Sequence, residues 1–240
     1  MSWNIHGTQT ILTSNEALEY LKLYDFIHLV ETWTTSDTTL DKNFESYEPF
    51  YAHGCRRSTR GRTPGGIAVF IHNRIKHIFK HIKTSEYGIY FKINSEYVSN
   101  SDKDIILVCV YIPCENSTFY ARKEEENGIL GLLNELIELV CPTSNVILMG
   151  DFNARTAELA DYITDDDINY LALPTWWESD AFCVPRKSRD KSVNTFGLTL
   201  IDLCKELGVH MLNGRSVFDN DGEFTFLSTI GKSVVDYVLV

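Results

Sequence analysis

The segment VILMGDFNAR, residues 146–155, constrains the fold and chemistry of this chain more than any other. It begins with an apolar run too short for a stable helix, which predicts a buried strand. Two polar side chains, Asp151 and Asn153, follow at the end of this strand, while Phe152 between them is expected to point into a core. A carboxylate and a carboxamide in this arrangement suit a hard cation, a water molecule or a phosphate. The alternative is a turn closed by the aspartate side chain.

The composition predicts one domain over residues 1–240. With 240 residues, of which 44% are apolar, the chain is long enough to bury a large core. No stretch is long and apolar enough to span a bilayer, and the N-terminus lacks the order of a secretion signal. The six cysteines show neither a CxxC pair nor a histidine partner at metal-finger spacing. We therefore expect an intracellular protein with reduced thiols and no membrane partner.

The net charge of −11 argues against a protein that coats nucleic acid non-specifically, because such binding requires an excess of Lys and Arg. Positive charge is nevertheless clustered in two loops. The clusters are Arg56, Arg57, Arg60 and Arg62, and Arg186, Lys187, Arg189 and Lys191. Either cluster is suited to contact a phosphate backbone. A solvated charged loop is the alternative, and we favour it for the second cluster, which Asp190 interrupts.

Hydrophobic periodicity predicts interleaved strands and helices. Strands are expected at residues 3–5, 26–30, 67–71, 89–93, 105–111, 146–149, 209–212, 224–226 and 233–240, the last two forming a hairpin about Gly231. Helices are expected from a capping box at Thr13 and Glu16 through Leu23, at 122–140, and at 198–207 before Gly208. An irregular insert from 156 to 191 contains Trp176 and Trp177, expected to pin the loop or to stack on a base. The mixture of elements indicates an α/β sandwich rather than a parallel sheet.

Several predicted strands carry a polar residue at or near their end, of a type used in metal and phosphate chemistry. These residues are Asn4, Glu31, Tyr111, Asp151 and Asp236. Each has a simpler explanation when taken alone: Asn4 or Glu31 in a turn, Tyr111 in the core, Asp236 facing water at an edge. A carboxylate inside a strand such as Asp236 is costly, however, unless it is paired or bound.

Ordered motifs along almost the whole chain resemble the endonuclease/exonuclease/phosphatase superfamily. They are WNIHG near the start, ETW at 31–33, YIP at 111–113, GDFNAR, and SVVDYVLV at the end. Within this superfamily, GGIAVFI at 65–71 and NTFGLTLIDLCKELGVHMLNGR at 194–215 resemble the endonuclease domain of LINE-type, non-LTR retrotransposons. The resemblance implies an α/β fold: a four-layer, DNase I-like sandwich of two mixed β-sheets packed face to face with helices outside, here truncated at both ends.

The resemblance also implies a role for each matching residue. Glu31 and Asn4 are the expected ligands of Mg²⁺, with Mn²⁺ as the alternative ion. Tyr111 is expected to hydrogen-bond the scissile phosphate. Asp151 is expected to orient or deprotonate the attacking water, and Asn153 to hold that water or a phosphate oxygen.

The remaining matches concern the end of the chain and the DNA. Asp236 matches an aspartate that orients a catalytic histidine. Thr225 and Ser233 match positions that contact the DNA backbone, and Arg56 and Arg57 are expected to bind the substrate as well. The implied reaction nicks double-stranded DNA in the nucleus, so that the freed 3′ hydroxyl primes a reverse transcriptase encoded in the same parent polyprotein.

One part of the family pattern is missing. The pattern ends with a Ser-Asp-His triplet after the DY strand, whereas this sequence stops at Val240. Either the chain is a fragment of an active Mg²⁺-dependent nuclease, or it is a decayed remnant that binds DNA or metal only. A third reading keeps the fold and makes the protein a phosphatase of the same superfamily. Target-site preference and oligomeric state do not follow from the sequence.

Overall fold

The computed structural model describes residues 1–54, 63–99, 102–120, 128–137, 139, 144–163, 184–229 and 231–240. The chain divides into two compact units, Met1–Phe152 and Asn153–Val240, and each is described by itself. A single domain over residues 1–240 stays a prediction. Within the described ranges, no helix has the length and apolar character needed to cross a membrane.

The first sheet of unit 1 has the strand order β1-β2-β4-β3. Its strands are β1 (Ser2–Asn4), β2 (Phe26–Val30), β3 (Tyr47–Ala52) and β4 (Ile67–His72). Strands β1 and β2 run parallel, and β4 is antiparallel to both β2 and β3. The sheet is therefore mixed, as expected. The strands predicted at 26–30 and 67–71 are confirmed, whereas β3 was not predicted.

The second sheet of unit 1 has the order β8-β7-β6-β5. Its strands are β5 (Phe79–Thr84), β6 (Gly88–Ile93), β7 (Asp104–Tyr111) and β8 (Ser144–Asp151). Strands β7 and β8 run parallel, and the other neighbours are antiparallel. Three of these strands confirm the predicted runs, and β5 was not predicted.

The helices of unit 1 differ from the prediction at the N-terminus. Two short helices, α1 (Thr8–Leu12) and α2 (Asn15–Leu21), replace the single helix expected from Thr13 to Leu23. The expected capping box is wrong: the Ser14 hydroxyl caps α2 by accepting from the backbone N–H of Ala17, and Thr13 ends α1.

Helix α3 (Ile129–Ile137) lies within the helix expected at 122–140. Residues 122–127, 138 and 140 of that prediction lie outside the described residues. Short 3₁₀ turns span Asp41–Asn43, Lys76–Ile78, Ser95–Tyr97 and Thr118–Tyr120.

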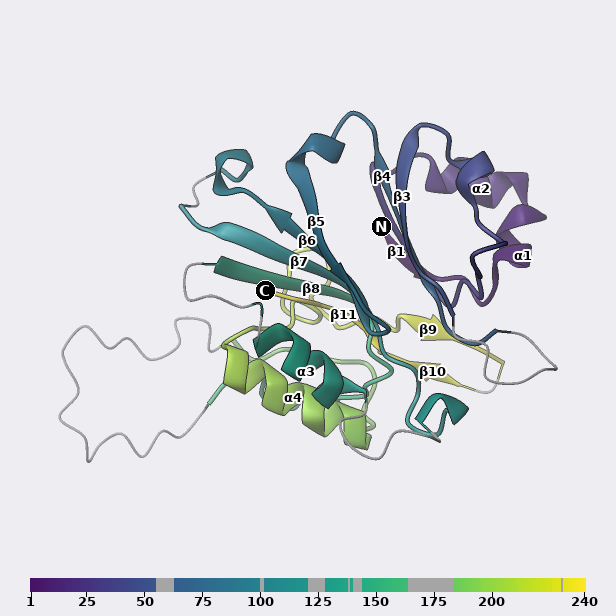
Figure 1. Cartoon of the computed structure of the whole chain (residues 1–240). Coiled ribbons are helices and arrows are strands. Elements are labelled where there is room, and N and C mark those ends of the chain that lie inside the picture. The colour runs from purple at the N-terminus through teal and green to yellow at the C-terminus, as the bar shows by residue number, and fades with distance from the viewer. Residues whose placement is uncertain are drawn as a thin grey trace, which may run out of the picture. The chain divides into compact units, whose positions relative to one another are not determined.

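Unit 1 is layered (Figure 1). One apolar cluster lies between the two sheets and includes Val69 of β4 and Phe91 of β6. A second cluster packs α1 and α2 on the outer face of the first sheet and includes Leu21 and Phe70. On the second sheet, the Tyr90 hydroxyl of β6 donates to Glu135 of α3 at 2.5 Å. The order helix, sheet, sheet, helix confirms the predicted four-layer α/β sandwich.

Unit 2 is built around helix α4 (Thr195–Leu207), which starts before the predicted Leu198 and, as predicted, ends at Gly208, a residue in a left-handed conformation. A short hairpin pairs β9 (Phe226–Leu227) with β10 (Lys232–Ser233) about Gly231, and β11 spans Asp236–Leu239.

Two strand predictions in unit 2 need correction. The strand expected at 209–212 is reduced to one bridge, Met211 to Leu239, and the Met211 N–H donates to the buried Asp161 carboxylate. The strand expected at 233–240 is interrupted at Val234, whose N–H donates to Asp190. The described parts of the insert at 156–191 contain no helix and no strand, and Trp176 and Trp177 lie outside the described residues.

Candidate active site

Four of the predicted site residues lie at the carboxyl ends of strands in unit 1. Asn4 ends β1, and Glu31 follows the parallel neighbour β2, with Asn4 paired to Val30. Tyr111 ends β7 and Asp151 ends β8, and the two are register partners. The carboxyl ends of parallel neighbours lie at the same edge of a sheet, so each sheet contributes two site residues to one edge.

Two hydrogen bonds link these four side chains across the two sheets. The Asn4 amide Nδ2 donates to Asp151 Oδ2 at 2.9 Å, and the Tyr111 hydroxyl donates to Glu31 Oε1 at 3.2 Å. Asp151 is only 3% exposed, and Tyr111 is buried with the apolar cluster between the sheets. The structure thus brings Asn4, Glu31, Tyr111 and Asp151 together within unit 1.

The backbone before Asp151 admits only glycine. Gly150 has φ of 142°, and a Cβ added there would lie 2.0 Å from the carbonyl oxygen of Val110. Glycine alone adopts such a conformation at no steric cost and allows this approach of two strands. Gly150 therefore allows the backbone of β8 to lie close to β7 just before Asp151.

His6 is a further member of the cluster that the sequence prediction did not assign. Its Nδ1 lies 3.0 Å from Glu31 Oε2, and its ring packs edge-on against Trp33 with centroids 4.9 Å apart. His6, Glu31 and Trp33 all have positive φ, at 49°, 53° and 54°. Left-handed backbone is uncommon for such residues and concentrates at functional sites. The available signal was the position of His6 in the WNIHG motif, two residues after Asn4.

The two carboxylates affect nearby titratable groups. Burial, followed by the negative charges of Glu31 and Asp151, raises the pKa of Tyr111 well above its usual value. Burial and the charge of Glu31 likewise raise the pKa of the Cys114 thiol. The Tyr111 hydroxyl consequently stays protonated as a hydrogen-bond donor, and this edge of unit 1 attracts a cation.

The donor set fits a partly hydrated hard cation. Among the described residues, no group of three or more His, Cys, Asp or Glu side chains is arranged to hold a metal ion. Mg²⁺, however, is commonly held by one or two carboxylates and keeps several water ligands. The Glu31 carboxylate and the Asn4 amide oxygen, near the second negative charge of Asp151, are compatible with such binding.

The other predicted site residues described by the structure belong to unit 2. The Thr225 hydroxyl accepts from the backbone N–H groups of Val235 and Asp236, both at 3.1 Å, and the Thr225 N–H donates to the Ser233 carbonyl at 3.0 Å. Thr225, Ser233 and Asp236 are therefore neighbours at the β9–β10 hairpin. Their roles toward DNA or a histidine stay predictions. Arg56 and Arg57, with Arg60 and Arg62, lie outside the described residues.

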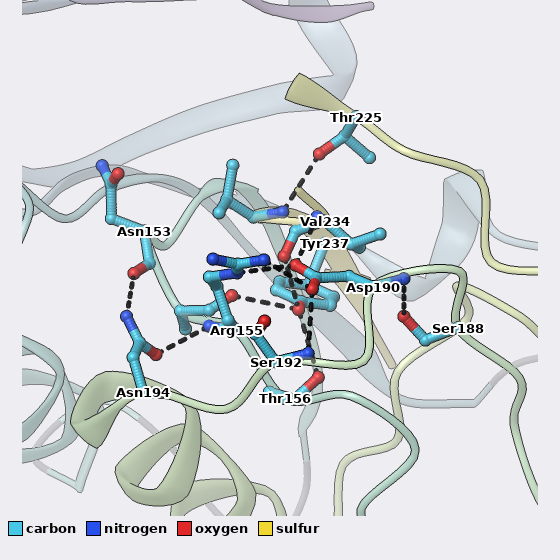
Figure 2. A network of polar contacts seen from close by, with 12 residues as sticks. Asn153, Arg155, Thr156, Ser188, Asp190, Ser192, Asn194, Thr225, Val234 and Tyr237 are labelled. Atoms are coloured by element: carbon cyan, nitrogen blue, oxygen red, sulfur yellow. Dashed lines mark hydrogen bonds and ion pairs between the residues drawn. The ribbon is translucent and has the colours of Figure 1, made fainter. Parts of the chain in front are cut away.

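Asn194 fixes the backbone around Asn153 (Figure 2). Its side chain donates to the Asn153 carbonyl at 3.0 Å and accepts from the Arg155 N–H at 2.8 Å. The same side-chain oxygen caps α4 by accepting from the Gly197 N–H at 2.8 Å. Asn153 itself has φ of 49°. The position of an asparagine before an apolar helical run was the signal that could have identified this cap.

A second part of the network joins Arg155 to Asp190 (Figure 2). Arg155 donates to both Asp190 oxygens, at 2.8 and 2.7 Å, and Asp190 also accepts from the N–H groups of Ser192 and Val234. Burial alone would raise the pKa of Asp190, but these hydrogen bonds outweigh it and hold the pKa below its usual value. Asp190 is 3% exposed, so it anchors the loop rather than merely interrupting a run of cations.

The second basic cluster is in part the solvated charged loop favoured from the sequence, because Lys187, Arg189 and Lys191 are exposed. Arg186 is buried and donates to the Thr156 hydroxyl at 2.6 Å. The other three cations pair with acids of unit 2: Lys187 with Asp221, Arg189 with Glu223, and Lys191 with Glu158. These partners reduce the charge that the cluster can offer to a phosphate backbone.

A two-sheet sandwich with carboxylate, amide and phenol groups at its strand ends is compatible with a hydrolytic enzyme of the nuclease and phosphatase class. A family model described as "Endonuclease/Exonuclease/phosphatase family" matches residues 1–240, and the chain belongs to this family. The superfamily resemblance is thereby confirmed. A search of curated proteins found no match.

Solved structures with the same fold include two AP endonucleases and an exonuclease. AP endonuclease LMAP from Leishmania major has a TM-score of 0.63 and 13% identity, with 99% of this chain and 77% of that chain covered. An AP endonuclease from Archaeoglobus fulgidus has a TM-score of 0.58 and 16% identity, covering 99% and 84%. The 3′-5′ exonuclease NExo from Neisseria meningitidis has a TM-score of 0.56 and 16% identity, covering 100% and 85%. At these identities the likeness concerns the fold.

Proposed function

We propose that this chain is the endonuclease domain of a LINE-type retrotransposon and hydrolyses a phosphodiester of double-stranded DNA with a divalent metal ion. The observation that supports the proposal best is the pair of hydrogen bonds, Asn4 to Asp151 and Tyr111 to Glu31, at one edge of unit 1. The motifs at 65–71 and 194–215 favour the retrotransposon subtype within the family.

Each residue of the cluster has a part in the proposed hydrolysis. Asp151, oriented by the Asn4 amide, accepts a proton from the attacking water. The Tyr111 hydroxyl, which donates to Glu31 in the structure, turns its single proton from Glu31 to a non-bridging phosphate oxygen when the substrate binds. The water oxygen bonds to phosphorus as the bond to the 3′ oxygen breaks, which leaves a 5′ phosphate and, after protonation, a 3′ hydroxyl.

Glu31 and Asn4 are the proposed ligands of Mg²⁺ or Mn²⁺. When bound there, the ion supplies positive charge that stabilises the negative charge on the phosphate oxygens. Asn153 holds the water or a phosphate oxygen, and Asp236 orients a histidine supplied by the segment that follows in the family pattern.

The β9–β10 hairpin supports contact with DNA. Phe226 and Leu227 are exposed on it, and no acidic residue occurs between Phe224 and Val235. We propose that Thr225, Ser233 and Lys232 contact the backbone here, with Arg56 and Arg57 as further contacts. The proposed site of action is the nucleus, and the proposed partner is a reverse transcriptase domain of the same polyprotein.

A plasmid-nicking assay tests this function. Supercoiled DNA is incubated with Mg²⁺ or Mn²⁺ and either this chain or a form extended through the Ser-Asp-His triplet. We expect nicking by the extended form, its loss in Glu31→Gln and Asp151→Asn, and its retention in the exposed-acid controls Asp37→Asn and Glu45→Gln. Unchanged melting temperatures show that the variants fold.

The alternatives give different results in the same assay. A remnant that only binds DNA or metal retards the plasmid in a gel but leaves it supercoiled in both forms. A phosphatase leaves the plasmid intact while releasing phosphate from a phosphorylated inositol or nucleotide. Either result overturns the endonuclease proposal.

A further inference from the structure

His6 lies beside Glu31, and the proposed hydrolysis gives the His6 side chain no role. His6 Nδ1 lies 3.0 Å from Glu31 Oε2. Adjacent ligands of an octahedral ion with bonds of about 2.1 Å are roughly 3.0 Å apart. In the structure the two atoms form a hydrogen bond, and the same spacing suits two ligands of one ion when Nδ1 carries no proton.

The loop that carries His6 is held in place from several sides. The His6 N–H donates to Asn4 Oδ1 at 3.1 Å, and the Gly7 N–H donates to the Glu31 carbonyl at 2.8 Å. A Cβ on Gly7 would lie 2.4 Å from the ring of Trp33, so the glycine permits the close packing of this loop on Trp33. These contacts hold the His6 ring nitrogen beside a Glu31 oxygen and the His6 backbone beside the Asn4 amide oxygen.

The His6 side chain is not used to fill the core. It is 71% exposed, in a strained backbone conformation, and its ring touches Trp33. Left-handed backbone of this kind concentrates at functional sites, and here it places an exposed imidazole against a carboxylate.

We propose that His6 is a nitrogen ligand of the ion at Glu31 and makes this site prefer a first-row transition cation, such as Mn²⁺, over Mg²⁺. Mg²⁺ strongly favours oxygen ligands, whereas imidazole nitrogen suits first-row transition ions. The inference rests on the proposed metal role of Glu31 and refines it.

Metal binding by the isolated protein, without DNA, tests the proposal. Affinities for Mn²⁺ and Mg²⁺ are measured by calorimetry, and pulsed electron paramagnetic resonance of bound Mn²⁺ detects coupling to a ligand nitrogen. The main variant is His6→Asn, because asparagine tolerates positive φ while lacking the imidazole. The control is His77→Ala, which removes another exposed histidine that packs edge-on against a ring, here Tyr97 at 5.7 Å.

We expect wild type to bind Mn²⁺ more tightly than Mg²⁺ and to show nitrogen coupling. His6→Asn should abolish the coupling and weaken Mn²⁺ binding about 10-fold to 100-fold, with a much smaller effect on Mg²⁺. His77→Ala should match wild type. Coupling that survives in His6→Asn, or an unchanged ratio of affinities, overturns the proposal.

Glu31→Gln separates this proposal from the function on which it rests. If Glu31→Gln loses both metals while His6→Asn behaves as wild type, only the role of His6 is wrong. If Glu31→Gln binds both metals as wild type does, the metal role of Glu31 is wrong, and the inference about His6 falls with it.

Discussion

The side-chain amide of Asn4 donates a 2.9 Å hydrogen bond to the carboxylate of Asp151, 147 positions away in the sequence. The bond joins the first strand of one sheet to the last strand of the other within unit 1. It also occupies one oxygen of a carboxylate that is almost fully buried. The orientation of the proposed base is therefore set by a residue of the opposite sheet.

Removal of this bond should slow cleavage without unfolding the protein. A hydrogen bond to a charged group contributes about 1.5–3 kcal/mol, so we expect Asn4→Ala to lower kcat/KM of the extended form about 10-fold to 100-fold. Asn4→Asp should lower kcat/KM further, because it places a second negative charge beside Asp151. The exposed Asn73→Ala is the control. An unchanged kcat/KM in Asn4→Ala would show that this hydrogen bond does not orient Asp151 for cleavage.

Tyr111→Phe tests the hydroxyl that lies against Glu31. Burial and the two neighbouring carboxylates raise the pKa of Tyr111, so the phenol stays protonated through the alkaline range in which free tyrosine ionises, near pH 10. We expect the substitution to lower the cleavage rate about 10-fold at every pH and to leave the shape of the pH profile unchanged. If the wild-type rate falls at alkaline pH and Tyr111→Phe abolishes that fall, the assignment of a permanently protonated donor is wrong.

His28 should make the stability depend on pH. It is fully buried on β2, where burial and then the nearby N-terminal charge lower its pKa from 6.5 to about 3. Below pH 6.5 the unfolded chain takes up a proton that the folded protein does not accept until about pH 3, so stability is lost as the pH falls through this window.

Denaturant unfolding at several pH values measures this contribution. Relative to His28→Gln, wild type should lose up to about 1.4 kcal/mol of unfolding free energy for each pH unit between about 6.5 and 3. The exposed His77→Gln should keep the wild-type slope. Parallel pH dependences of wild type and His28→Gln would contradict the prediction.

The ion pair between Arg155 and Asp190 should stabilise unit 2. Asp190→Ala removes a buried acceptor of four hydrogen bonds, from Arg155 twice and from Ser192 and Val234, and we expect a loss of about 2–3 kcal/mol in the free energy of unfolding. Glu158→Gln weakens the solvent-exposed pair with Lys191 in the same unit and should change little. Equal effects of the two substitutions in denaturant unfolding would count against the anchoring role of Asp190.

The predictable parts of the fold are the strands with unbroken apolar runs. The runs at 26–30 and 67–71 are buried inside a sheet, where sequence and burial agree. Strands β3 and β5 were not predicted. They are outer strands of the two unit 1 sheets, where Pro49 in β3 and the lysines of β5 are tolerated. Edge strands need fewer apolar residues, so periodicity alone does not reveal them.

The same distinction applies to the candidate site. Asn4, Glu31, Tyr111 and Asp151 could be predicted because each directly ends or follows a recognisable strand. His6 and the Arg155–Asp190 pair were not predicted because they lie outside the strands, where hydrophobic periodicity gives no position for a side chain and the contacts depend on how the loops fold back. The true α2 cap, Ser14 rather than Thr13, was one position from the predicted one, an error typical of helix ends.

The carbonyl of Val110 stands where any side chain at position 150 would have to go. A library that randomises the codons of β8 and selects for folded protein should return only glycine at position 150. It should accept other residues at the partly exposed Ile147 and Met149. The backbone that leads to Asp151 thus leaves no room for a side chain at position 150, whereas other positions of β8 are open to substitution.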